Sequence, residues 1–199
     1  MQTRSEITHE GIMKAAVAEF SRSGYDAASV ADICKEAGVS KGAFYHHFPS
    51  KQKLFLAIMQ DWLKGIDKQL FSRRSPDKTI PEMIQDMGST LAVIFQVASG
   101  QLPMFMEFMI QASRDKEVWS AVVAPYRHYQ QRFASMIREG IEEGSFREDT
   151  DADETAWALM SMAIGILLQG IVDPQAANWE DVTKKGVQMI LDGLKRRNE

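Results

Sequence analysis

The sequence predicts an all-α protein, with a small N-terminal helical domain and a larger C-terminal one. Alanine, leucine, methionine, glutamate and lysine, which favour helices, are plentiful along the 199 residues. The alternation of β-branched residues that is typical of strands is absent, and so are Asn-Gly hairpin turns. Apolar residues recur instead at intervals of three and four, the period of one helix face. We place the domain boundary between 1–53 and 54–199.

Three helices are predicted in the first 50 residues. Gly24 suits the position just past the end of the first helix. Ser29 and Asp32 have the spacing of a capping box at the start of the second, and Gly38 ends it. Pro49 cannot continue the third helix. The three helices are therefore expected at 8–23, 29–37 and 40–48.

The rest of the chain is expected to form longer helices. One begins after Ser50, and a break follows at 72–78. The run Thr79-Ile80-Pro81-Glu82 then has the form of a capping box with a proline in the first turn. Later helices are expected at 83–98, 102–116, 118–144 (with Pro125 as a kink or break), 153–171 and 181–197.

Charge and composition exclude several classes of protein. The formal net charge is −4, with a net of +1 in residues 1–53 and −5 in the remainder, so charge alone does not indicate nucleic acid. Cys34 is the one cysteine and cannot form an internal disulfide. No signal peptide is visible, and the apolar stretch 157–172 is interrupted by Ser161, Gly165 and Gln169. We therefore expect a cytoplasmic protein without a membrane span.

Residues 24–51 carry the pattern most typical of a function. Two short helices are joined by the tight turn Ala37-Gly38-Val39-Ser40, as in a helix-turn-helix, whose second helix enters the major groove of DNA. Phe44 and Phe48 are four residues apart and should be core. The other face carries Lys41 and Tyr45, which can donate hydrogen bonds to phosphates and base edges.

Residues 8–55 resemble the DNA-binding domain of the TetR family of bacterial repressors. One departure is His9, where the family often has arginine. The resemblance implies a homodimer that binds double-stranded operator DNA. The matching run is Ile12, Ala15, Ala16, Phe20, Gly24-Tyr25, Ser29-Val30, Ile33, Ala37-Gly38-Val39-Ser40, Gly42, Phe44-Tyr45, His47-Phe48, Lys51 and Leu54.

The resemblance also implies a role for each residue of the motif. Ser40, which can cap the recognition helix, belongs to the predicted DNA-binding set. The positions implied to touch base edges are Lys41, Gly42, Ala43 and His46. The positions implied to contact phosphates are Ser29, Tyr45, His47 and Lys51.

A Met-rich segment at 102–110 either lines a ligand pocket or fills the core, and its periodicity does not separate the two. The resemblance favours a pocket for a hydrophobic small-molecule effector. The predicted pocket residues are Phe95, Met104, Phe105, Phe108, Met109, Trp119, Tyr126, Tyr129, Trp157 and Met160.

Two C-terminal helices carry broad apolar faces, which either pair with a second copy or are buried within one subunit. The resemblance favours a dimer. The predicted interface residues are Ile164, Leu167, Leu168, Ile171, Val187, Ile190, Leu191 and Leu194.

No metal site, cofactor or catalytic group is expected. The pair His46-His47 has no third ligand nearby in sequence. The acidic run 149–154 lacks the glycine and final glutamate of a calcium loop.

The predicted function is a transcriptional repressor released from DNA by a small molecule. The alternatives are control by a protein partner, activation instead of repression and, less favoured, a helical enzyme.

Overall fold

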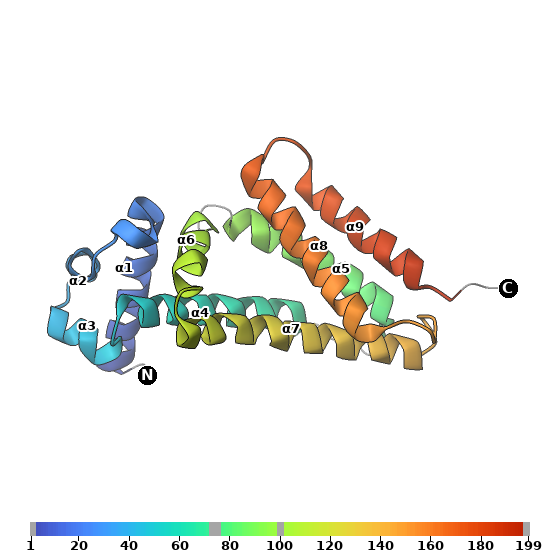
Figure 1. Ribbon diagram of the computed structural model, residues 1–199, viewed down its shortest axis with the longest axis horizontal. Helices are drawn as coiled ribbons and strands as arrows, with labels where there is room; N and C mark the ends of the chain where they lie inside the picture. The colour runs from blue at the N-terminus through green and yellow to red at the C-terminus, as the bar shows by residue number, and fades with distance from the viewer. Residues whose placement is uncertain (1–2, 72–76, 99–101, 197–199) are drawn as a thin grey trace. The chain divides into compact units, whose positions relative to one another are not determined.

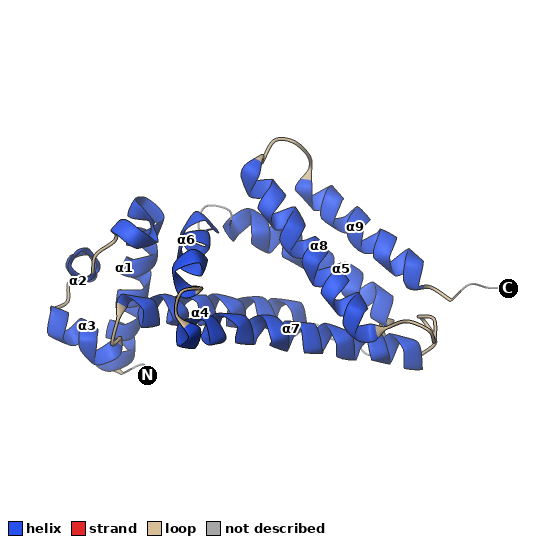
Figure 2. Ribbon diagram, in the orientation of Figure 1, coloured by secondary structure: helices blue, strands red, loops and turns tan. Residues whose placement is uncertain are grey.

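The computed structural model describes residues 3–71, 77–98 and 102–196, with the backbone alone for 92–98 and 102. These residues form nine helices and contain no β-strand (Figures 1 and 2). The only pairing of strand type among them is an isolated bridge between Phe146 and Lys195. The predicted all-α class is confirmed.

The observed helices follow the predicted order. Their bounds are α1 Arg4–Ala27, α2 Val30–Ala37, α3 Lys41–His47, α4 Lys51–Phe71, α5 Ile80–Ala98, α6 Leu102–Ala112, α7 Lys116–Glu142, α8 Ala152–Val172 and α9 Trp179–Leu194.

Helices α1, α6 and α7 differ most from the prediction in length or continuity, and α6 ends at Ala112 instead of residue 116. Helix α1 begins four residues early, because Thr3 and Glu6 form a reciprocal capping box at its start. It then continues past Gly24, which has a φ of 80° and marks a kink. Helix α7 runs through Pro125 without a break, since a proline removes one hydrogen bond and the remaining turns still hold the helix.

By packing, the chain divides into two compact units. The first contains Met1–Gly65 and Gly100–Val123, and the second contains Ile66–Ser99 and Ala124–Glu199. Helices α4 and α7 therefore each run from one unit into the other. The first unit includes α6 and thus extends beyond the helix-turn-helix segment, so the functional boundary near residue 53 stays a prediction.

Aromatic side chains from three helices fill the core of the first unit. Phe20 of α1 and Phe55 of α4 are no more than 1% exposed, and their ring centroids lie 5.4 Å apart. Phe108 of α6 is fully buried and stacks on Phe55 with centroids 4.1 Å apart. Offset stacks of this kind stabilise a core beyond the area that they bury. Helix α6 is therefore part of the support for the N-terminal helices.

The second unit is a layer of helices in which α9 packs against both α5 and α8. Val187 of α9 approaches Gly88 of α5 so closely that an added Cβ would lie 2.9 Å from its methyl group. Close approach of this kind needs a residue without a side chain. The small residue therefore fixes how near α9 lies to α5.

Candidate nucleic-acid interface

Caps at three positions fix the turn between α2 and α3. The Ser29 hydroxyl oxygen accepts a hydrogen bond from the Asp32 backbone N–H at 3.2 Å, which caps α2. Gly38 ends α2 with a φ of 65°, in the left-handed region that glycine adopts without strain. The Ser40 hydroxyl oxygen then accepts from the Ala43 N–H at 3.1 Å and caps α3. The local sequence alone thus specifies a helix-turn-helix.

Helix α3 is anchored from one side and open on the other. Phe44 and Phe48 are 0% and 3% exposed, which places them in the core as predicted. Tyr45 is 52% exposed, and Lys41 and His46 are also exposed. A short helix held by two buried rings can present its other face to the major groove. Of the remaining positions in the predicted DNA-binding set, Ser40 and Gly42 are exposed, and Ser29, Ala43, His47 and Lys51 are half-buried.

Three histidines from α1 and α3 lie together beside this face. The His47 ring centroid lies 5.8 Å from that of His9 and 5.3 Å from that of His46. Burial lowers the pKa of His47, and the neighbouring His46 and His9 lower it further. A neutral imidazole can still donate one N–H to a phosphate. His47 and His9 also line a pocket of about 340 Å³ together with Ser5, Glu6 and Glu10 of α1.

Metal binding has no support from this cluster. Across the parts of the chain that the structure describes, no group of three or more His, Cys, Asp or Glu side chains is placed to hold a metal ion. Cys34 of α2 is buried, and burial raises the pKa of its thiol. A buried thiol with a raised pKa is a poor nucleophile.

Lys51, a predicted phosphate contact, has its ammonium bound at the end of α1 in this structure. Its ammonium donates to the carbonyl oxygens of Tyr25 at 2.7 Å, Ala28 at 2.9 Å and Asp26 at 3.2 Å. It also lies 4.5 Å from the centroid of the Tyr25 ring. An ammonium has three N–H donors, and all three are occupied here. Lys51 therefore caps the end of α1, a contact across more than 20 residues that local sequence patterns do not reveal.

Helix α6 is tied to the end of α1 by polar contacts. The Glu107 carboxylate accepts from the Tyr25 backbone N–H at 2.7 Å, and the Gln111 side-chain amide donates to Asp26 at 3.0 Å. An added Cβ at Gly24 would lie 2.8 Å from the Glu107 carboxylate. The kink of α1 is therefore shaped to receive a side chain of α6.

This packing corrects the predicted ligand-binding role of the Met-rich segment. Met104, Phe105 and Phe108 are 2%, 9% and 0% exposed and belong to the core of the first unit. Met109 is half-buried and packs against the same core. The sequence left core and pocket as alternatives, and the structure shows core for these four side chains.

The other predicted pocket residues are scattered. Trp119, Tyr126 and Trp157 are 38%, 38% and 46% exposed, whereas Met160 is 8% exposed. The half-buried Tyr129 lies beside Phe71, with ring centroids 6.4 Å apart. The Phe95 side chain lies outside the described residues.

The structure contains a cavity that sequence reasoning missed. It has a volume of about 500 Å³, lies within the second unit, and is lined by none of the predicted pocket residues. A signal was present, because Met83 and Met87 lie four apart on α5 beside Asp86 and Thr90. The lining residues are Gln69, Leu70 and Phe71 of α4, Lys78, which precedes α5, Ile80, Met83, Asp86, Met87, Ser89 and Thr90 of α5, and Arg132, Ser135, Met136 and Glu139 of α7.

The predicted dimer residues fall into three groups by exposure. Val187, Leu191 and Leu194 of α9 are 5%, 2% and 8% exposed, so they are buried within one subunit and are corrected to core. Ile164 and Leu168 of α8 are 38% and 37% exposed. Leu167, Ile171 and Ile190 are half-buried.

Further apolar side chains extend the exposed face of α8 and α9. Val172 of α8 is 86% exposed and Met189 of α9 is 70% exposed. Helix α8 has a mean hydropathy of 1.8 in its most apolar window and is, by length and composition only, long enough to cross a membrane. A single such helix is weak evidence for a span. An apolar face this open also fits a second copy of the chain.

Two family descriptions match this chain. "Bacterial regulatory proteins, tetR family" matches residues 12–58, which contain the helix-turn-helix. "BetI-type transcriptional repressor, C-terminal" matches residues 94–192.

Known proteins resemble the chain along nearly its whole length. The HTH-type transcriptional regulator UidR of Escherichia coli is 28% identical over 194 residues, which cover 98% of this chain and 96% of that protein. A TetR-family regulator from Cytophaga hutchinsonii has the same fold, with a TM-score of 0.80, 18% identity and full coverage of both chains. A regulator from Saccharomonospora viridis, solved in complex with choline, matches with a TM-score of 0.76 and 20% identity over 95% of this chain and 98% of that one.

Proposed function

Because this chain belongs to the TetR family of transcriptional regulators, we propose that it is a homodimeric repressor that a small molecule releases from its operator. The observation that carries the proposal is the construction of α3. Phe44 and Phe48 hold it from the core, and its opposite face is open to a DNA groove.

The proposed contacts divide into two kinds. Lys41 and His46 are assigned to base edges, where a lysine can donate to guanine O6 or N7. Gly42 and Ala43 are small and let the start of α3 sit deep in the groove. Phosphate contacts are assigned to Tyr45 and to the groups described next, since contacts of this kind position a protein without reading sequence.

The other phosphate contacts are assigned to Ser29, His47 and Lys51. The Ser29 hydroxyl is in contact with the Asp32 carboxylate, so it would have to rotate to donate to a phosphate. His47 donates through a neutral imidazole. Lys51 would contact the phosphate through the backbone N–H groups at the N-terminal turn of α4, because its ammonium is hydrogen-bonded to carbonyl oxygens at the end of α1.

The proposed dimer pairs α8 and α9 with the same helices of a second copy. Trp157, Ile164, Leu168 and Val172 follow one another along α8 at helical spacing, and each is at least 37% exposed. Met189 adds to this face from α9. A symmetric four-helix contact would cover these side chains and place two α3 helices on one operator. As a DNA-binding protein of this kind, it would act in the cytoplasm.

Two observations support control by a small molecule. One structural neighbour binds choline, and the second unit has a cavity of about 500 Å³, within the usual range of ligand pockets. Control by a protein partner remains the second candidate. Activation uses the same DNA contacts and is separated from repression only by a transcription assay.

A reporter promoter that carries the bound sequence tests the proposal. Expression of the protein is expected to lower transcription, and Lys41→Ala is expected to relieve repression by weakening binding by about 1–3 kcal/mol at one base position. Tyr45→Phe, which removes one phosphate donor, should instead weaken binding to all sequences. Raised transcription from the same promoter would show an activator.

A further inference from the structure

The cavity of the second unit is lined by an apolar set of side chains, called the apolar wall here, and a polar set, called the polar wall, and α5 contributes to both. Leu70, Met87 and Met136 are 5%, 8% and 9% exposed and form part of the apolar wall together with Met83. Methionine is flexible and adapts its shape to an apolar surface. This wall therefore suits a hydrocarbon portion of variable shape.

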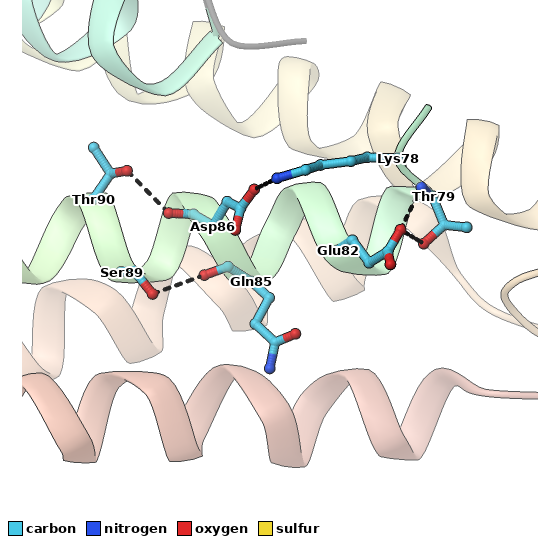
Figure 3. A network of polar contacts seen from close by, with 7 residues as sticks. All are labelled: Lys78, Thr79, Glu82, Gln85, Asp86, Ser89 and Thr90. Carbon is cyan, nitrogen blue, oxygen red and sulfur yellow. Dashed lines mark hydrogen bonds and ion pairs between the residues drawn. The ribbon is translucent and has the colours of Figure 1, made fainter. Parts of the chain in front are cut away.

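On α5 the polar wall consists of Asp86, Ser89 and Thr90, and the hydroxyls of Ser89 and Thr90 are hydrogen-bonded along the helix. The Thr90 hydroxyl donates to the Asp86 carbonyl at 2.9 Å, and the Ser89 hydroxyl donates to the Gln85 carbonyl at 3.3 Å (Figure 3). Because each hydroxyl already donates its hydrogen to a carbonyl, its oxygen can take part in a further hydrogen bond only as an acceptor. Ser135 and Gln69 of the facing helices bring groups that can both donate and accept.

The charged groups of the lining already have interaction partners. Lys78 forms an ion pair with Asp86, as Figure 3 shows, and Arg132 forms one with Asp67 of α4. The remaining charged group of the lining, Glu139, also has an interaction partner. A charged ligand would compete with these partners for the same charged groups, whereas an uncharged ligand would leave the ion pairs intact.

The aromatic face that a quaternary ammonium would use is already covered. Phe71 is the one aromatic residue among the lining residues that the structure describes. The Arg132 guanidinium lies over its ring, 3.5 Å from the centroid. A cation–π site needs an open aromatic face, so this cavity does not suit a ligand like choline.

From these features we propose that the cavity between α4, α5 and α7 binds an uncharged amphipathic molecule, with several hydroxyl or amide groups and an apolar portion. Hydroxyls and amides meet acceptors and donors on the polar wall without disturbing its ion pairs. The apolar portion lies on the methionines. The proposal rests on the proposed function, because it assigns the effector pocket and the chemical class of the effector.

Three probes with similar six-carbon chains distinguish uncharged, anionic and cationic ligands. They are hexyl glucoside, hexanoate and hexyltrimethylammonium. Calorimetric titration of the full chain without DNA, below the micelle concentration, is expected to show the glucoside binding at least about tenfold more tightly than either ion. Ser135→Phe fills the cavity from α7 and should weaken glucoside binding by about tenfold or more. Gln131→Phe, at an exposed position of α7 outside the cavity, is the matched control and should leave it unchanged.

The outcomes separate the pocket from the regulatory function. Equal or tighter binding of an ion, no binding of the glucoside, or full binding by a folded Ser135→Phe variant would overturn the proposal. Glucoside binding that Ser135→Phe removes, without any change in DNA affinity, would support the pocket and contradict its role in release. Release from DNA by another molecule, unaffected by Ser135→Phe, would place the effector elsewhere and leave the repressor function standing.

Discussion

Gly24 and Glu107 form the contact on which the link between α1 and α6 depends. Gly24→Ala is expected to lower the free energy of unfolding by about 1–3 kcal/mol, because a φ of 80° strains an alanine. The new Cβ would also lie 2.8 Å from the Glu107 carboxylate. Urea denaturation measures the change.

Gly11 in the same helix provides the matched control for that substitution. An added Cβ there meets nothing within 4 Å. Gly11→Ala should therefore raise stability by up to about 1 kcal/mol, since alanine favours a helix interior. Equal effects of the two substitutions would show that neither the kink nor Glu107 constrains Gly24.

Lys51 is expected to affect folding more than DNA affinity. Lys51→Met removes the donor from three carbonyls at the end of α1 and should cost about 1–3 kcal/mol of stability. The slope of log affinity against log salt concentration should stay unchanged. A slope smaller by about one unit would instead show that Lys51 neutralises a phosphate. Lys53→Met, which breaks an exposed pair with Glu117, is the control for stability.

His47 is expected to make DNA affinity depend on pH. Its pKa is lowered in the free protein by burial and by His46 and His9, and an adjacent phosphate would raise it. Binding therefore takes up a proton, and affinity should rise as the pH falls from about 8 to 6. The increase in DNA affinity ends at pH values below the pKa that His47 has in the free protein.

Substitution of His47 tests whether this residue causes the pH dependence of DNA affinity. Fluorescence anisotropy of labelled operator DNA is measured across the pH range at constant ionic strength. His47→Gln keeps an N–H donor without titrating, so its pH dependence should be weaker. The same pH dependence in wild type and His47→Gln would assign the proton to a group other than His47 and contradict the proposed phosphate contact.

The helices show which parts of the structure a sequence can predict. The boundaries of α2 and α3 follow from Ser29, Gly38, Ser40 and Pro49, because caps and breakers act within a few residues. Phe44 and Phe48 were predicted to be core for the same local reason. The recognition helix was therefore predictable almost in full.

The partner of an apolar face was much harder to predict. Phe105 and Phe108 were assigned to a pocket, yet they pack on Phe55 of α4. Val187 was assigned to a dimer and packs on Gly88 of α5. Periodicity identifies which residues are covered but not what covers them. The same limit hid the cavity, whose lining comes from three helices and is half polar in its residue types.

The proposed dimer would join these elements into an operator-binding assembly. Leu168→Arg places a charge in the exposed apolar stripe of α8 and should convert the dimer to a monomer in sedimentation experiments. Operator affinity should then fall by about 100-fold or more, because two linked contacts become one. Gln131→Arg, an exposed position of α7, is the control.

The alternatives for this face give different results. A Leu168→Arg variant that stays dimeric and binds DNA normally would place the interface elsewhere. Wild-type protein that is soluble only in detergent would favour a membrane for α8 instead of a second copy.

Selection of bound sequences from a random duplex pool, at a fixed salt concentration, tests the central claim most directly. A dimer that reads DNA with α3 should enrich a near-palindrome whose half-sites lie about one helical turn, roughly 10 bp, apart. Loss of this enrichment in Lys41→Ala at one base position would assign that base to Lys41. No enriched sequence from folded, dimeric, ligand-free protein would contradict sequence-specific operator binding.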